Sequence, residues 1–111
     1  MQVSEQRQGA VTVLTPKGPL THEQVEAFGR KLDEAFTASL GRFVLDTSQI
    51  PFIDSRGLEL LLDTTEQLAQ SGQSLKLCGS NETVREVLSL TELSDQFEHY
   101  DDVNSAVRSF L

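Results

Sequence analysis

Residues Phe43–Leu62 read FVLDTSQIPFIDSRGLELLL, and along this segment the pattern changes from that of a strand to that of a helix. The first four residues form a short apolar run rich in β-formers, which predicts a buried strand. Asp54 and Ser55 are typical helix-start residues, because a short side-chain oxygen can accept a hydrogen bond from a free N–H of the first turn. The loop before them ends in the apolar pair Phe52-Ile53, which we expect to hold the loop against the core.

The helix predicted after this start carries one apolar stripe. Its members recur at helical spacing and are Leu58, Leu61, Leu62, Thr65, Leu68 and Ala69. Glu59 and Asp63 face the other way, and Leu60 lies off the stripe, so we expect its side chain to be partly exposed. Gly57 has two interpretations: a steric requirement for a close approach, or a tolerated residue that costs about 1 kcal/mol of helix stability.

The motif FIDSRGL at Phe52–Leu58, placed after the strand-like Val44–Ser48, resembles the signature of STAS domains. This family comprises bacterial anti-sigma-factor antagonists and related cytoplasmic domains of sulphate transporters. The resemblance extends over nearly the whole chain in length and in element order. In the antagonists a partner kinase phosphorylates the serine that follows the aspartate, so the resemblance implies that Ser55 is a phosphoacceptor.

Two positions depart from the antagonist pattern. Arg56 stands where the antagonists usually carry a second hydroxyl residue, and Thr21 stands about where they carry an acidic residue close to the serine. Arg56 is equally compatible with a solvated side chain and with a partner contact. The absence of a carboxylate at Thr21 argues against any kinase or nucleotide contact that depends on one.

The rest of the chain predicts alternating strands and helices. In chain order the pattern predicts a hairpin of Ser4–Gln8 and Ala10–Thr15 ended by Pro16, Gly18 and Pro19, and then a helix capped by Thr21 with Gln24. It further predicts a strand Ser74–Cys78, a helix capped by Asn81, an edge strand Phe97–Tyr100 and a terminal helix beginning at Asp101 or Asp102. We therefore expect an α/β fold, a single STAS-like domain over 1–111 with a central mixed β-sheet and about four α-helices.

We expect the apolar stripes of these elements to meet in one core. Its predicted members are Val11, Val13, Val44, Leu45, Leu58, Leu61, Leu62, Leu75, Leu77, Val107 and Phe110. The terminal helix has a strong stripe of its own, formed by Val103, Ala106, Val107, Phe110 and Leu111.

Composition narrows the classes of function. The chain has 111 residues and a formal net charge of −8, which disfavours binding to nucleic acid or to an anionic membrane surface. Its one cysteine, Cys78, excludes an internal disulfide and is expected to fill the core.

The sequence also bears on localisation. Met1–Arg7 lacks the apolar region of a signal peptide, and no apolar run is long enough to span a bilayer. We therefore expect a cytoplasmic protein without direct membrane insertion.

Three hypotheses of function remain, with the oligomeric state left open. The first is an anti-sigma-factor antagonist-like module, switched by serine phosphorylation, whose partner is an anti-sigma factor and serine kinase of the histidine-kinase-like ATPase type. Its expected docking face comprises Asp54, Ser55, Arg56, Glu59, Leu60 and Asp63. The second is a non-phosphorylated STAS subunit of a transporter or stress-sensing assembly. The third, a small enzyme or nucleotide-binding protein, is disfavoured because the chain has no phosphate loop and no metal-ligand spacing. We therefore expect no catalysis, no cofactor and no metal.

Overall fold

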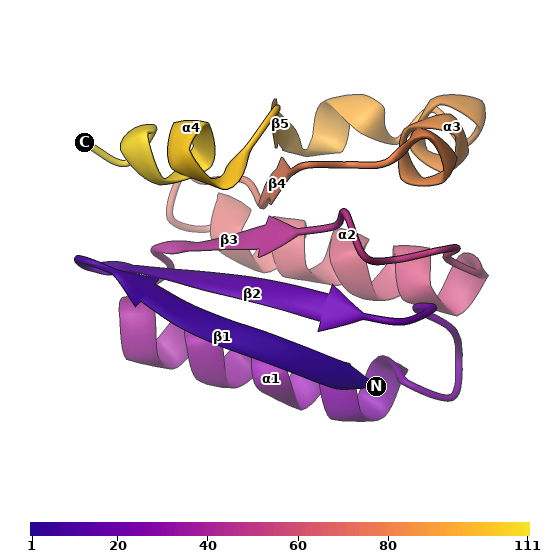
Figure 1. Cartoon of the computed structure of the whole chain (residues 1–111), viewed down its shortest axis with the longest axis horizontal. Helices are drawn as coiled ribbons and strands as arrows, with labels where there is room; N and C mark the ends of the chain where they lie inside the picture. The colour runs from indigo at the N-terminus through magenta and orange to yellow at the C-terminus, as the bar shows by residue number, and fades with distance from the viewer.

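The computed structural model describes all residues, 1–111, with a five-stranded sheet in the order β1-β2-β3-β4-β5 (Figure 1). β1 and β2 are antiparallel and every other neighbouring pair is parallel, so the sheet is mixed. The elements are β1 (Gln2–Gln8), β2 (Val11–Lys17), α1 (Val25–Ser39), β3 (Phe43–Asp46), α2 (Ser55–Ala69), β4 (Lys76–Cys78), α3 (Glu82–Leu90), the 3-10 helix η1 (Ser94–Gln96), β5 (Glu98–Tyr100) and α4 (Val103–Arg108). The predicted α/β fold with a mixed sheet and four helices is confirmed.

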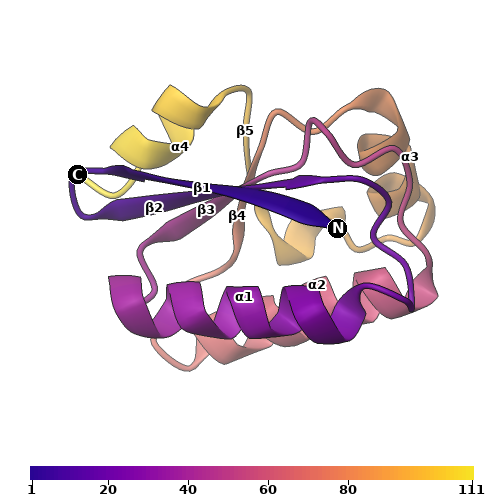
Figure 2. The ribbon, with the colours of Figure 1, turned by 60° about the horizontal axis from the view of Figure 1, so that its bottom comes forward.

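The helices cover both faces of the sheet. Figure 2 shows α1 and α2 side by side on one face and α4 on the other. The crossovers from β2 through α1 to β3, and from β3 through α2 to β4, join parallel neighbours and place both helices on the same face. Val84 and Leu88 of α3 belong to the cluster of buried side chains on that face.

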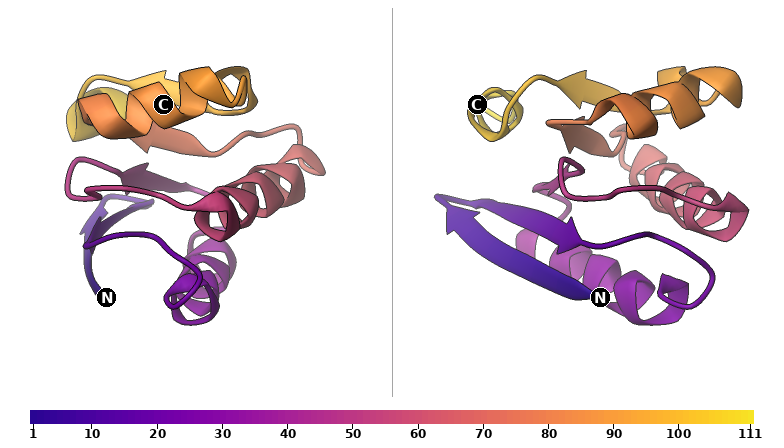
Figure 3. Two further views of the ribbon diagram at one scale, coloured as in Figure 1. Left: turned by 90° about the vertical axis from the view of Figure 1, so that its right-hand side faces the viewer. Right: turned by 45° about the vertical axis from the view of Figure 1, so that its right-hand side comes forward.

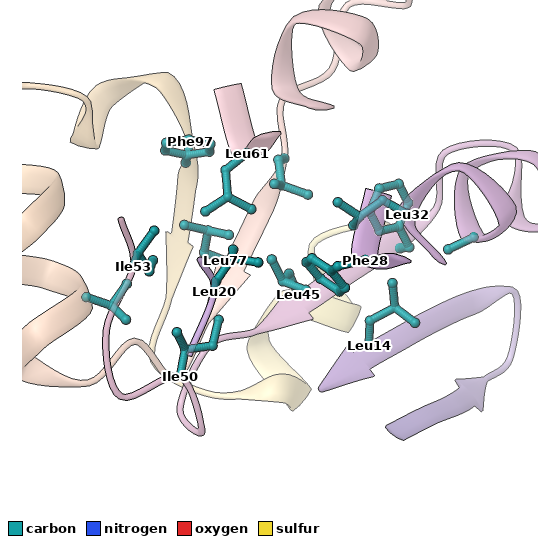
Figure 4. Packing of buried hydrophobic residues seen from close by; sticks show 14 of the residues in the cluster. Leu14, Leu20, Phe28, Leu32, Leu45, Ile50, Ile53, Leu61, Leu77 and Phe97 are labelled. Atoms are coloured by element: carbon teal, nitrogen blue, oxygen red, sulfur yellow. The ribbon is translucent and has the colours of Figure 1, made fainter. Parts of the chain in front are cut away.

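Buried side chains form two clusters, one on each face of the sheet. The larger has 16 residues, among them Leu14, Leu45, Leu61 and Leu77 (Figure 4). The smaller lies under α4 and contains Val11, Val13, Val44, Cys78 and Ala106, with Val107 and Phe110 packed against it. The prediction of one core was therefore wrong. Successive side chains of a strand point to opposite faces of the sheet, so neighbours such as Val44 and Leu45 enter different clusters.

Helix α2 follows its predicted stripe closely. Leu61, Thr65 and Leu68 are buried, Leu58 and Leu62 are half-buried, and Ala69 at the end of the helix is exposed. The Thr65 hydroxyl donates to the carbonyl of Gln96 and accepts from the N–H of Leu75, both at 2.9 Å. A threonine therefore fits this buried stripe because both hydrogen-bonding roles of its hydroxyl are satisfied.

The start of α1 differs from the prediction. Gln24 Oε1 accepts from the Thr21 N–H at 3.2 Å, which is one of the two contacts of a capping box. The Thr21 hydroxyl donates to the same Oε1, whereas in a capping box it would accept from the Gln24 N–H. These residues form a turn closed by the bond from the Gln24 N–H to the Thr21 carbonyl, however, and α1 begins only at Val25 without a side-chain cap. The helix therefore starts about one turn later than the pattern indicated.

Strand β2 continues through Pro16 and ends at Lys17, so it ends within the predicted segment of Pro16, Gly18 and Pro19, two residues later than expected. The Thr12 N–H points toward β3, so Pro16 has its nitrogen on the same side, but β3 pairs only as far as Leu14 and no donor is needed there. Two further local predictions were wrong. Phe52 is 50% exposed, and only Ile53 of the apolar pair enters the core. Leu111 is fully exposed, because α4 ends at Arg108 and the helical stripe is not continued.

Candidate functional site at the start of helix α2

Asp54 fixes the start of α2 and joins it to the turn before α1. Its Oδ1 accepts from the Gly57 N–H at 2.9 Å, and its Oδ2 accepts from the His22 N–H at 2.9 Å. The His22 Nδ1 lies 3.5 Å from the same Oδ2. The hydrogen bond from Gly57, and next that from His22, hold the pKa of Asp54 below its usual value. The aspartate is therefore an ionised cap that links two segments 32 residues apart in the chain.

Gly57 lets the first turn of α2 approach the backbone at Leu20. The Leu20 N–H donates to the Phe52 carbonyl at 3.0 Å, and the Asp54 N–H donates to the Leu20 carbonyl at 3.1 Å. A Cβ on Gly57 would lie 2.3 Å from that carbonyl oxygen and 2.9 Å from Cγ2 of Ile53. The steric interpretation of Gly57 is therefore correct, because no side chain larger than hydrogen fits.

Ser55 is the first residue of α2 and is exposed. Its hydroxyl makes no hydrogen bond within the chain, since capping of the helix is performed by Asp54. The N-terminus of a helix carries a partial positive charge and unpaired N–H groups. The position therefore leaves the hydroxyl accessible and provides an environment that accepts an added negative charge.

A shallow groove of about 390 Å³ runs between α1 and α2 beside this helix start. Two apolar side chains, Val25 and Leu60, line it together with the polar residues His22, Glu26, Arg56, Glu59 and Asp63. Leu60 is half-buried and packs against the larger cluster, so part of its surface serves stability. The groove thus has a small apolar surface with both signs of charge around it, the usual composition of a modest protein interface.

The fold brings most of the predicted docking residues together. Arg56, Glu59, Leu60 and Asp63 line the groove, and Asp54 is joined to its edge through His22. Ser55 does not line the groove, but it directly precedes Arg56 at the exposed start of the helix. Whether these six residues bind a partner remains a prediction.

Three residues near the site were not predicted from the sequence: His22 and Val25 in the groove, and the half-exposed Phe52 before the cap. The resemblance to STAS domains implies that the turn at Thr21 lies close to Ser55. This was the one indication in the sequence that the neighbouring His22 belongs to the site. Nothing in the local pattern distinguished Phe52 from Ile53, because both are apolar residues at the end of a loop.

The remaining candidate residues lie elsewhere. Cys78 is fully buried in the smaller cluster, and burial raises the pKa of its thiol to about 12. No three His, Cys, Asp or Glu side chains are grouped so that they could hold a metal ion. None of the helices combines the length and the apolar character needed to cross a membrane.

Comparison with known proteins identifies the family. The family model described as the STAS domain matches residues 2–106. A candidate anti-sigma factor antagonist of Thermotoga maritima is 30% identical over 98 residues, which cover 87% of each chain. A crystal structure of a candidate anti-sigma factor antagonist from the same organism superimposes with a TM-score of 0.87 at 27% identity, covering 96% of this chain and 92% of that one.

The Bacillus cell fate determinant SpoIIAA in its phosphorylated form shares the fold. Its structure gives a TM-score of 0.69 at 20% identity, and the superposition covers 97% of this chain and 99% of that chain.

The match of the STAS family model extends from β1 into α4 and includes the segment Asp54–Gly57 that forms the candidate site. The chain therefore belongs to the STAS domain family.

Proposed function

We propose that this protein is a regulatory binding module of the anti-sigma-factor antagonist kind, which phosphorylation of Ser55 switches off. The observation that carries the proposal is the exposed Ser55 hydroxyl, which is free of internal hydrogen bonds at the start of a helix. The family to which the chain belongs includes proteins named as anti-sigma factor antagonists, and this supports the proposed class of partner.

The unphosphorylated protein docks through the groove between α1 and α2 and through the surface beside it. Leu60 and Val25 supply apolar contact, and Glu59, Asp63 and Arg56 form a charged rim. Phe52 does not line the groove, but it is half-exposed three residues before Ser55 and offers a further apolar side chain. The proposed partner is an anti-sigma factor that is also a serine kinase of the histidine-kinase-like ATPase type, acting in the cytoplasm.

Phosphorylation acts on the interface and not on the fold. A phosphate adds a charge of about −1.5 to −2. The helix N-terminus stabilises this charge, so α2 remains folded. Asp54, Glu59 and Asp63 are close in sequence and already acidic, so the added charge and bulk are unfavourable where a partner must exclude water. Release therefore follows from repulsion and desolvation at the docking face.

The proposed role is binding and not catalysis. The Asp54 carboxylate accepts hydrogen bonds from the backbone N–H groups of Gly57 and His22, one on each oxygen, and these bonds stabilise its ionised form. A carboxylate held in this way, with a lowered pKa, is a poor base for activating the neighbouring serine. Ser55 is thus proposed as a substrate of another enzyme.

Phosphorylation in vitro tests the switch directly. The purified chain would be incubated with Mg-ATP and each anti-sigma factor kinase of this type from the same genome, and the modified residue would be located by mass spectrometry. We expect phosphate on Ser55 and none on the Ser55→Ala variant. Ser48 and Ser80 serve as internal competitors for the kinase. Ser48 is exposed, whereas the Ser80 hydroxyl is hydrogen-bonded to the Thr47 hydroxyl at 2.8 Å. Phosphate mainly on another residue, or on none, would remove the switch hypothesis.

Binding to the same partner tests the docking face. Leu60→Ala and Glu59→Arg should weaken binding, whereas Glu66→Arg on the same helix but outside the groove is the matched control. Arg56→Ala should act more weakly, with an effect that decreases as salt is added, because an exposed charge is screened. The Leu60→Ala variant also loses packing against the larger cluster, so its unfolding midpoint must be measured together with its affinity for the partner. A stability loss with unchanged affinity of the folded protein would argue against a docking role for Leu60.

The second candidate function is a STAS subunit of a transporter or stress-sensing assembly that is never phosphorylated. Arg56 and Thr21, which replace a hydroxyl and an acidic residue of the antagonist pattern, favour it. On this hypothesis Ser55→Asp and Ser55→Ala would bind the partner equally well. On the first hypothesis Ser55→Asp weakens binding, though less than true phosphate, because it carries less charge and fewer acceptor oxygens.

A further inference from the structure

Strand β1 is an open edge of the sheet. It is seven residues long, contains no proline and pairs only with β2, and nothing covers its outer side in the two views of Figure 3. Proteins usually protect such an edge with proline, a bulge or charges, because its free N–H and C=O groups are a template for pairing with another strand. Here the one protective feature is a pair of charges, Glu5 and Arg7.

The backbone groups that face outward can be assigned from the pairing. The Thr12 N–H donates to the Arg42 carbonyl on the β3 side, so the N–H and C=O of the next residue, Val13, point toward β1. Val13 is opposite Gln6, and Gln6 therefore directs its backbone groups inward to β2. Directions alternate along a strand, so the backbone groups of Glu5 and Arg7 point outward without a partner.

The side chains of Glu5 and Arg7 are also without partners. Both are exposed, and neither belongs to any of the ion pairs of the chain. They lie on the same face of the sheet as Val3, which packs against the larger cluster. A small apolar niche of about 110 Å³, lined by Met1, Val3, Ala27, Phe28 and Lys31, opens beside this edge.

We propose that β1 is a self-association edge at which two copies of this chain pair antiparallel, with Gln6 opposite Gln6 of the second copy. This register places Glu5 of each copy opposite Arg7 of the other, so the unpaired backbone groups form four hydrogen bonds and the side chains form two ion pairs. It also places Gly9 of the second copy opposite Val3, next to the apolar niche. The result is a continuous sheet across two copies.

The charges select this register against its neighbours. Pairing centred on Glu5 would place two carboxylates face to face, and pairing centred on Arg7 would do the same with two guanidinium groups, each of which is unfavourable. Registers centred on Ser4 or Gln8 would leave Glu5 and Arg7 without each other as partners. The alternation of sign therefore blocks indiscriminate pairing of the edge while permitting a single self-complementary arrangement.

Sedimentation equilibrium of the full chain at increasing concentration tests the association. Because the interface is small, the experiment should extend from about 10 µM to about 1 mM. We expect the mass to rise from the 12.3 kDa of one chain toward twice that value. We also expect the amide hydrogens of Glu5 and Arg7 to exchange more slowly as concentration rises. A mass that stays at one chain throughout would overturn the proposal.

Two charge reversals test the register. Glu5→Arg and Arg7→Glu each place like charges opposite one another at two symmetric positions, so each should weaken self-association by about 10- to 100-fold. An equimolar mixture of the two variants should associate again, because every cross-strand pair in the heterodimer is then Arg with Glu. Glu66→Arg is the control for net charge, since it makes the same change on α2. Undiminished dimers of Glu5→Arg, or a mixture that fails to associate, would overturn the register.

Discussion

Replacing Gly57 with alanine tests the geometry that holds the candidate site. Gly57 is the third residue of α2, and its Cα faces the carbonyl of Leu20. A Cβ there would lie 2.3 Å from the Leu20 oxygen and 3.0 Å from Cγ of the same residue. A gap of 2.3 Å is closer than a carbon and an oxygen can approach, and the obstacle is backbone. Either α2 or the segment at Leu20 must therefore move.

Three contributions, one stabilising and two destabilising, determine the stability of this variant. In an exposed helix, alanine would be more stable than glycine by about 1 kcal/mol. Overpacking a tight contact costs about 1–3 kcal/mol. Moving α2 also lengthens the 3.1 Å hydrogen bond from Asp54 to the Leu20 carbonyl, whose net contribution is about 1 kcal/mol. We therefore expect Gly57→Ala to destabilise the fold by about 1–3 kcal/mol.

Urea unfolding measures this difference, and Gly29→Ala is the matched control. Gly29 lies inside α1, where an added Cβ would meet only Cδ1 of Leu60 at an ordinary contact distance of 3.4 Å. The control should gain up to about 1 kcal/mol from helix propensity. Both substitutions replace glycine with alanine. If the two urea midpoints shift in opposite directions while the dependence of the unfolding free energy on urea concentration stays equal, the difference is due to the close approach of Gly57 to Leu20. A midpoint for Gly57→Ala at or above that of the wild type would refute the steric argument.

Three further predictions concern the core, the cap and the thiol. Leu61→Ala should cost about 2–5 kcal/mol, because Leu61 is fully buried in the larger cluster; a loss below about 0.5 kcal/mol in denaturant unfolding would contradict that packing. The lowered pKa of Asp54 means that its carboxylate stabilises the folded state above its ordinary pKa of 3.8 and loses this effect as the pH falls through the lower folded value. Unfolding midpoints of wild type and Asp54→Asn should therefore converge in the acid range, and a constant difference would disprove the linkage. Cys78 should resist thiol reagents in the native protein and react on unfolding, since it is buried and its pKa is raised to about 12; rapid native labelling would contradict its burial.

The sequence predicted the features that depend on neighbouring residues. Helix α2 begins at Ser55 with Asp54 as its cap, and α3 begins after Asn81, because capping needs only a side-chain oxygen and the N–H groups of the next turn. The alternation of strand and helix was sufficient to predict an α/β fold. Periodicity also identified the buried stripe of α2, including the unusual Thr65.

The tertiary structure decided the features that join distant segments. The contact between Asp54 and His22, the approach of Gly57 to Leu20 and the groove between α1 and α2 each depend on how two crossovers are laid on one face of the sheet. No local pattern encodes the distance between segments about 30 residues apart in the chain. For the same reason the half-exposed position of Phe52 could not be predicted. The division of the core into two clusters, by contrast, follows from the alternation of side chains along the strands, which the sequence already contains. Local hydrogen bonding and periodicity determine where elements begin and which side is apolar, whereas packing alone determines what each side meets.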